Sequence, residues 1–197
     1  MTHSLLSPTA TLLVGSLRAA ITRGGDDSAV AARVSRTLAG HLTDPFLLSV
    51  AQREPDPNAY RQHVLHVEPD GSFSVVALIW LPGQETCIHD HVSWCVVGTY
   101  VGEEEETTYR LHGDRLIPLR VNRTPEGVAA YLVPPGDIHK VCNNSSSVAI
   151  SIHVYGADIG LLGTSIRRRY DQPVSDQPVS DQSLSDQSLS DQSLSER

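Results

Sequence analysis

The chain is poor in basic residues, and this scarcity limits the partners it can have. Its 197 residues include 15 Lys and Arg against 23 Asp and Glu, a formal net charge of -8. Proteins that bind nucleic acids usually gather Lys and Arg on one face to neutralise phosphates. The one dense basic cluster is at residues 167–169. We therefore expect no nucleic-acid partner.

Long apolar runs and paired cysteines are also missing. No stretch approaches the roughly 20 apolar residues that cross a bilayer, and the first residues lack the basic-then-apolar order of a secretory signal. The three cysteines are an odd number without the pattern of a disulfide scaffold. We expect a cytoplasmic protein with no membrane partner. A chain of 197 residues fits one domain with a sizeable core.

The pattern of apolar and polar residues divides the chain into three parts. Residues 1–45 carry apolar side chains at helical spacing, interrupted at Gly24 and Gly25, and predict a helical segment packed on the next part. Residues 46–170 are predicted to form an all-β barrel or sandwich. Residues 171–197 repeat a five-residue unit with one small apolar side chain, which predicts a disordered tail. A modified or partner-binding tail is the alternative, since every unit contains serine. The β-rich runs are 73–81, 94–101, 107–111, 115–121, 128–133 and 148–155.

Two motifs bring three histidines within reach of one metal ion. His89 and His91 are one residue apart, so both point to the same face of a β-strand. Residues 83–102 read G-x5-H-x-H-x3-C-x6-G, and residues 134–143 read P-x-G-x2-H-x3-N, where His139 could supply a third imidazole. We expect a metal site of three neutral imidazoles with open positions for an anionic ligand. Imidazole ligands alone leave zinc, nickel and manganese open.

These paired motifs resemble those of the cupin superfamily, and the neighbouring residues resemble the thiol dioxygenases of the cysteine dioxygenase type. The narrower resemblance adds Trp94, close behind the first histidine pair, and Ser151, His153 and Tyr155, which match that family's Ser-x-His-x-Tyr run. It extends over about residues 60–159. It implies an all-β cupin (jelly-roll) barrel behind the helical segment, with Fe(2+) held by the three histidines. The implied reaction converts a small thiol carboxylate and O₂ to a sulfinate.

The resemblance also implies roles for the downstream run. Ser151 would orient His153, and His153 would hold the Tyr155 hydroxyl over the open coordination positions, where a phenol can donate a hydrogen bond to O₂ or to the substrate carboxylate. In animal-type relatives a cysteine near the position of Cys95 forms a thioether with the matching tyrosine, whereas many bacterial relatives have glycine there. The sequence leaves open whether Cys95 and Tyr155 are crosslinked, because an unpaired buried cysteine is also ordinary core packing.

The contact to the substrate carboxylate is expected shortly before the first β-rich run. The family places arginine there in cysteine-specific enzymes and glutamine in enzymes that prefer 3-mercaptopropionate, and we align Gln62 with it. An ungapped count gives His63, and Arg61 is out of phase because a one-residue shift exchanges the faces of a strand. Arg167 or Arg168 could supply a bidentate contact to the carboxylate from another direction. Alternatively, Arg167 and Arg168 belong to a solvated basic cluster without a role in binding.

Two other functions stay open at this point. A different cupin enzyme could use zinc or nickel at the same histidines, and a non-catalytic cupin could bind a metabolite. We expect a monomer or a weak homo-oligomer whose partners are a small thiol and O₂.

Overall fold

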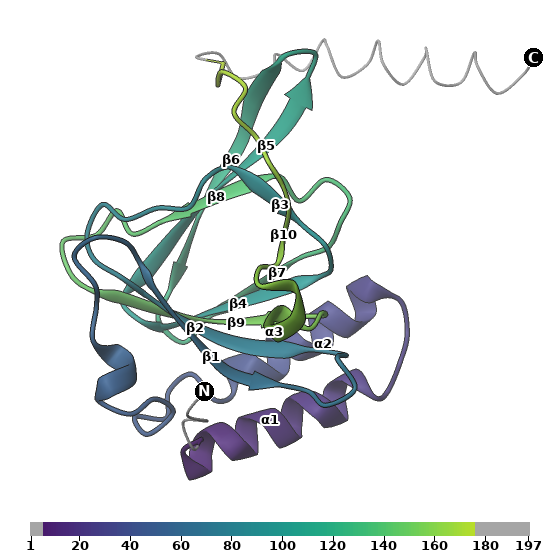
Figure 1. The fold of residues 1–197 in the computed structure, drawn as a ribbon, viewed down its shortest axis with the longest axis vertical. Helices are drawn as coiled ribbons and strands as arrows, with labels where there is room; N and C mark the ends of the chain where they lie inside the picture. Colours follow the sequence, from purple (N-terminus) through teal and green to yellow (C-terminus); the bar gives the residue numbers. More distant parts are fainter. Residues whose placement is uncertain (1–5, 176–197) are drawn as a thin grey trace, which may run out of the picture.

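The computed structural model describes residues 6–175 and contains two five-stranded sheets that enclose a barrel (Figure 1). The strand order is β1-β2-β9-β4-β7 in the first sheet and β10-β3-β8-β5-β6 in the second, and all neighbouring strands are antiparallel. The all-β cupin barrel with an N-terminal helical segment is confirmed. The greater part of the predicted disordered tail, from residue 176 on, lies outside the described residues.

The elements have the following bounds. The first sheet contains β1 (Arg61–Val67), β2 (Ser74–Trp80), β4 (Cys95–Val101), β7 (Ala129–Leu132) and β9 (Ala149–Tyr155). The second contains β3 (His89–His91), β5 (Glu103–His112), β6 (Arg115–Pro125), β8 (His139–Cys142) and β10 (Ile166–Arg169). The helices are α1 (Pro8–Ile21), α2 (Asp27–Ala39), the 3₁₀ turn η1 (Ala51–Arg53) and α3 (Ile159–Leu162).

Helices α1 and α2 lie against the outer face of the first sheet (Figure 1). Both begin at a side-chain cap: Ser7 and Asp26 each accept a hydrogen bond from the backbone N–H three residues on, at 3.0 and 2.8 Å. Helix α2 approaches β4 closely at Gly98, because a Cβ there would lie 2.8 Å from Leu38. Glycine at this position therefore sets the depth of the helix on the sheet.

Strands β2 and β9 are buried on both faces, and alternate residues serve two different cores. One set packs under the helices, and the other points into the barrel. The helix-facing set is Val75, Ala77, Ile79, Ile150, Ile152 and Val154, and the barrel-facing set includes Val76, Leu78, Trp80, Ala149 and Tyr155. Because side chains alternate along a strand, Ser151 and His153 also face the barrel interior.

The first residues of the predicted tail continue the barrel edge. Leu116 N donates a hydrogen bond to Pro173 O at 3.0 Å, and Ser175 N donates one to Leu116 O at 2.8 Å. Residues 171–175 therefore run beside β6, where the sequence predicted the start of a disordered segment.

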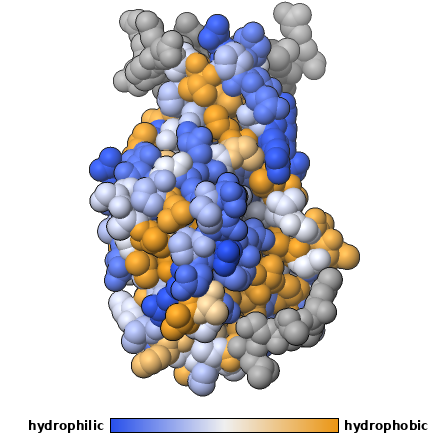
Figure 2. Space-filling view, turned by 60° about the vertical axis from the view of Figure 1, so that its left-hand side comes forward, coloured by the Kyte–Doolittle hydropathy of each residue, from blue (hydrophilic) through white to orange (hydrophobic). Residues whose placement is uncertain are grey.

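The surface face in Figure 2 mixes hydrophilic and hydrophobic side chains. Within residues 6–175, no helix has the length and apolar character that crossing a membrane requires. Cys87, Cys95 and Cys142 are all free thiols.

Candidate metal centre

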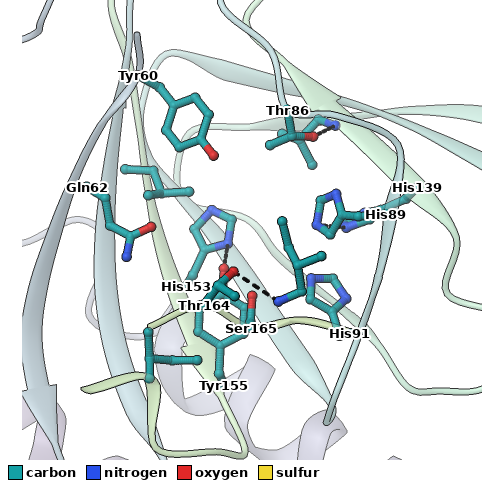
Figure 3. A pocket seen from close by; sticks show the side chains of 14 residues that line it. Tyr60, Gln62, Thr86, His89, His91, His139, His153, Tyr155, Thr164 and Ser165 are labelled. Atoms are coloured by element: carbon teal, nitrogen blue, oxygen red, sulfur yellow. Dashed lines mark hydrogen bonds between the residues drawn. The ribbon is translucent and has the colours of Figure 1, made fainter. Parts of the chain in front are cut away.

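The three predicted ligands meet inside the barrel, on one wall of a small pocket (Figure 3). His89 and His91 project from β3, and His139 projects from β8 directly opposite His89 in the strand pairing. Their ligand atoms lie within 4.8 Å of one another, and the Nε2 atoms of His89 and His139 are 3.2 Å apart. All three imidazoles are buried. Backbone register therefore brings the three imidazoles together.

Each of the three rings is held at Nδ1 by an oxygen that accepts a hydrogen bond. A carbonyl or a carboxylate in that position fixes the hydrogen on Nδ1 and directs the Nε2 lone pair to the centre. The Nδ1–O pairs are His89 with the Cys87 carbonyl at 2.9 Å, His91 with Asp137 at 3.0 Å and His139 with Glu106 at 2.7 Å.

The charges around the centre favour neutral imidazoles and ionised carboxylates. Burial, reinforced by the neighbouring His139, lowers the pKa of His89 to about 3, and burial also lowers the pKa of His91. Burial acts to raise the pKa of Asp137 and of Glu106, but the hydrogen bonds from His91 and His139 outweigh it and hold both below the usual value.

This donor set fits a divalent metal ion. Two Nε2 lone pairs that face each other at 3.2 Å repel unless a cation lies between them. Three imidazoles on one side leave the remaining coordination positions open toward the pocket. His89, His91 and His139 are therefore the residues that would hold the ion.

His153 and Tyr155 of β9 line the pocket across from the three ligands (Figure 3), and their hydrogen bonds continue to Ser151, which does not line it. The Ser151 Oγ lies 2.9 Å from His153 Nε2, and the Tyr155 hydroxyl lies 3.1 Å from His153 Nδ1. Trp80 Nε1 donates to the Ser151 Oγ at 3.1 Å, which anchors the far end of the chain. All four side chains are buried. The predicted order Ser151–His153–Tyr155 therefore forms a continuous hydrogen-bonded path inside an apolar core.

Cys95 and Tyr155 are cross-strand neighbours on β4 and β9. Both belong to the buried cluster inside the barrel. Burial, with smaller contributions from Cys95 and Glu104, raises the pKa of Tyr155 well above its ordinary value, and burial likewise raises that of the Cys95 thiol. Tyr155 therefore remains a neutral phenol that can donate a hydrogen bond.

The pairing of β1 with β2 decides which residue of the segment 61–63 faces the pocket. Gln62 lies opposite the barrel-facing Leu78, whereas Arg61 and His63 lie opposite the helix-facing Ile79 and Ala77. Gln62 accordingly lines the pocket, while Arg61 forms an ion pair with Asp56 at 3.4 Å.

The basic cluster at 167–169 is divided between the two faces of β10. Arg167 makes hydrogen bonds and an ion pair with Asp90, and the Arg168 guanidinium lies over the ring of Tyr170, 4.6 Å from its centroid. Neither lines the pocket. Arg168 pairs with the buried Asp90 in the strand register, and its contact with the substrate carboxylate stays a prediction.

Arg169, which the sequence analysis did not single out, is exposed and, like Arg167 and Arg168, does not line the pocket. It lies opposite His89 across β10 and β3, so it shares the strand face of a predicted ligand. Its charge acts on Tyr60, a pocket-lining residue. Among residues 6–175 the Arg169 side chain has no ion-pair partner. A register shift between Ile166 and Arg168 conceals this parity in the sequence.

The carboxylates that hold His91 and His139 were also missed. Asp137 lies between the predicted turn and His139, and this proximity was a usable signal. Glu106 lies within an acidic run at 103–106, where nothing in the sequence distinguishes it from its neighbours.

The chain is similar to known proteins in two comparisons, one with solved structures and one with family models. A cupin 2 conserved barrel domain protein from Salinispora arenicola is 22% identical, with a TM-score of 0.42, and the match covers 59% of this chain and 89% of that one. A conserved protein with a double-stranded β-helix domain from Klebsiella pneumoniae is 21% identical, with a TM-score of 0.44 and coverage of 58% and 92%. The family model described as cysteine dioxygenase type I matches residues 51–168, more than half of the chain and all residues of the histidine and Ser-His-Tyr motifs. By that match the chain belongs to the cysteine dioxygenase type I family.

Proposed function

We propose that this protein is a non-haem iron thiol dioxygenase that converts a small thiol carboxylate and O₂ to the corresponding sulfinate. The observation that carries the proposal is the pair of facing walls: three Nε2 lone pairs on one side of the pocket and the Ser151–His153–Tyr155 chain on the other. Bound Fe(2+) would supply the redox chemistry that activates O₂. Because the three imidazoles add no negative charge, the ion keeps its attraction for a thiolate.

The size of the pocket supports a small substrate. Its volume is about 40 Å³, and a single water molecule needs roughly 10–15 Å³ on the same measure. A pocket of this size suits a small ligand. Cysteine, cysteamine and 3-mercaptopropionate are all small thiols.

Gln62 and Arg169 support a carboxylate and favour 3-mercaptopropionate over cysteine. Gln62 lines the pocket and can donate its amide N–H to a carboxylate oxygen. Arg169 lies on the same side of β10 as the pocket and offers a guanidinium without an ion-pair partner among the described residues. Among residues 6–175, no carboxylate lines the pocket to bind the amino group of cysteine.

The Tyr155 hydroxyl is proposed to donate a hydrogen bond to the reacting molecules. Its ring centroid lies 5.9 Å from that of His91, and its raised pKa keeps the proton in place. Ser151 and His153 act through Tyr155 by fixing the direction of its hydroxyl.

A thioether between Cys95 and Tyr155 is a further part of this proposal. The two residues are directly opposite in the strand pairing, and the crosslink would form by oxidation with O₂ at the metal. Tryptic peptides of protein that has turned over substrate should then include a linked pair that lacks two hydrogen atoms. Unlinked peptides in fully active protein would remove the crosslink from the proposal.

Oxygen uptake tests the proposed function directly. The purified protein, loaded with iron or with zinc, is supplied in parallel with cysteine, 3-mercaptopropionate and cysteamine. We expect O₂ uptake by the iron-loaded protein and none by the zinc-loaded protein. The highest kcat/KM is expected with 3-mercaptopropionate, with one sulfinate formed per O₂ consumed. Activity with zinc, or no uptake with any thiol, would favour a different cupin enzyme. Arg169→Gln should raise the KM for the thiol carboxylates and leave that for cysteamine unchanged.

A further inference from the structure

Strand β3, which carries two of the three predicted ligands, is held mainly by the C-terminal strand β10. It has only three residues, and its pairing with β8 consists of a single pair. On its other edge, each of its residues is opposite a residue of β10. Backbone hydrogen bonds extend this contact at both ends. Val92 N donates to Ser165 O at 3.0 Å, and Tyr170 N donates to Ile88 O at 2.9 Å. The position of β3 therefore depends on how firmly β10 is held against it.

Asp90, between the two ligands of β3, forms the side-chain contacts that join the two strands. Because side chains alternate along a strand, Asp90 points away from the pocket that His89 and His91 face. Asp90 is 1% exposed. Tyr170 donates its hydroxyl to Asp90 Oδ2 at 2.8 Å, and Arg167 donates to both carboxylate oxygens. A buried carboxylate is unfavourable without such donors, so these contacts tie β10 to the centre of β3.

Of the two donors, Tyr170 is the more firmly placed. Its side chain is buried and packs with Tyr109 and Leu116 in a separate apolar cluster. The side chain of Arg167 is 54% exposed, so water and salt weaken its contact with Asp90. The Tyr170 hydroxyl is therefore the contact through which the cluster fixes Asp90.

We propose that Tyr170 is a positioning residue for the metal centre: by holding Asp90, it keeps His89 and His91 at the spacing that one ion requires. The inference rests on the ligands assigned in the proposed function and is independent of the proposed reaction. Ligands that are already in place lose less conformational freedom when an ion binds, so metal affinity is higher. Removing the Tyr170 hydroxyl should therefore weaken metal binding, although Tyr170 does not line the pocket.

Zinc affinity tests the inference without any assay of activity. The metal-free protein is titrated with Zn(2+) in competition with a chromophoric chelator. Tyr170→Phe keeps the ring and removes the hydroxyl, and its zinc affinity should be about tenfold lower, at the weak end of the effects of groups behind metal ligands. Equal zinc affinities in Tyr170→Phe and wild type would overturn the proposal.

The matched control is Tyr100→Phe, which also removes a buried tyrosine hydroxyl. Tyr100 belongs to the core under the helices, and its hydroxyl donates to the Asp44 carbonyl at 2.9 Å. This variant should unfold at a lower urea concentration than wild type and bind zinc as wild type does. If Tyr100→Phe and Tyr170→Phe lose the same zinc affinity, the loss reflects general stability, and the proposal is wrong.

Amide hydrogen exchange in the wild-type protein gives a decision even if Tyr170→Phe fails to fold. Coupling between two sites is reciprocal, so zinc binding has to strengthen the contact between β10 and β3. Saturating Zn(2+) should slow exchange of the Tyr170 N–H, relative to the Gly127 N–H that donates to Thr99 O in a distant turn. Unchanged exchange at Tyr170 would contradict the proposal. If the iron-loaded protein consumes no O₂ with any thiol, the proposed function fails while these zinc measurements still decide the role of Tyr170.

Discussion

The two sheets contribute to the pocket in different ways. The second sheet supplies three imidazoles from strands of three and four residues, and each ring is fixed by an oxygen acceptor behind it. The first sheet supplies a chain of hydroxyl, imidazole and phenol groups from a seven-residue strand buried on both faces. In the proposed function, one wall binds an ion and the other directs a proton. Substitutions in the two walls should therefore impair the protein in different ways: loss of iron in one case and loss of turnover in the other.

The largest effect is expected from the metal wall. His89→Ala, His91→Ala or His139→Ala should each lose iron and reduce O₂ consumption to background, because three ligands leave none to spare. The barrel should still fold, since its core packs without the ion. Iron content and oxygen uptake are measured on the same samples, with the exposed His112→Ala as the control. A variant that retains stoichiometric iron and full activity would remove that histidine from the ligand set.

The opposite wall should show the reverse pattern. Tyr155→Phe keeps the ring and deletes the hydroxyl, so iron content should stay near normal while turnover falls on the order of tenfold to a thousandfold. If Tyr155→Phe loses iron as the histidine variants do, the proposed division of roles between the two walls is wrong. An unchanged rate would mean that the Ser151–His153–Tyr155 chain is structural.

A smaller effect is expected at Gln62, where the first sheet contacts the substrate. Gln62→Arg should shift the ratio of kcat/KM values toward cysteine and away from 3-mercaptopropionate. A charged bidentate contact differs from an amide contact by roughly 1–2 kcal/mol, which corresponds to about 5–30-fold. Cys95→Gly should change the rate more than the preference. Wild-type protein that prefers cysteine by tenfold would show that Gln62 does not set the choice of substrate.

The smallest effect is a loss of stability of the metal-free protein in mild acid. The pKa of His89 is about 3 in the folded protein and about 6.5 in the unfolded chain. The unfolded chain therefore binds a proton first as the pH falls below 6.5, and the folded state is destabilised. This histidine should lower the free energy of unfolding by roughly 0.7 kcal/mol between pH 7 and 6. Urea unfolding of wild type and His89→Gln measures it, and identical pH dependences in the two proteins would contradict the shift.

The first sheet was also the more predictable of the two. Its strands β2, β4, β7 and β9 fall within long apolar runs bounded by turn residues, so their positions and parity are readable from the sequence. Strands β3, β8 and β10 are too short for a periodic signal, and the sequence located two of them only through their histidines. The alignment favours Gln62 over His63, and the pairing of Gln62 with Leu78 places Gln62 on the barrel face.

What the sequence could not supply are contacts between distant segments. Glu106 and His139 are separated by 33 residues, and Glu104 and His153 lie on different sheets. The orientation of Arg168 is hidden for a related reason, since a bulge in β10 changes the side on which its side chain lies. Spacing within one strand predicts which residues share a face, whereas pairing between strands decides what that face meets.

The most direct test of the central claim is the fate of ¹⁸O₂ during turnover. The iron-loaded protein is supplied with 3-mercaptopropionate and ¹⁸O₂ in unlabelled water, and the product is analysed by mass spectrometry. If the two walls act together as a thiol dioxygenase site, the sulfinate should carry both labelled oxygen atoms. A product with one labelled oxygen or none, formed at the same rate, would contradict the account.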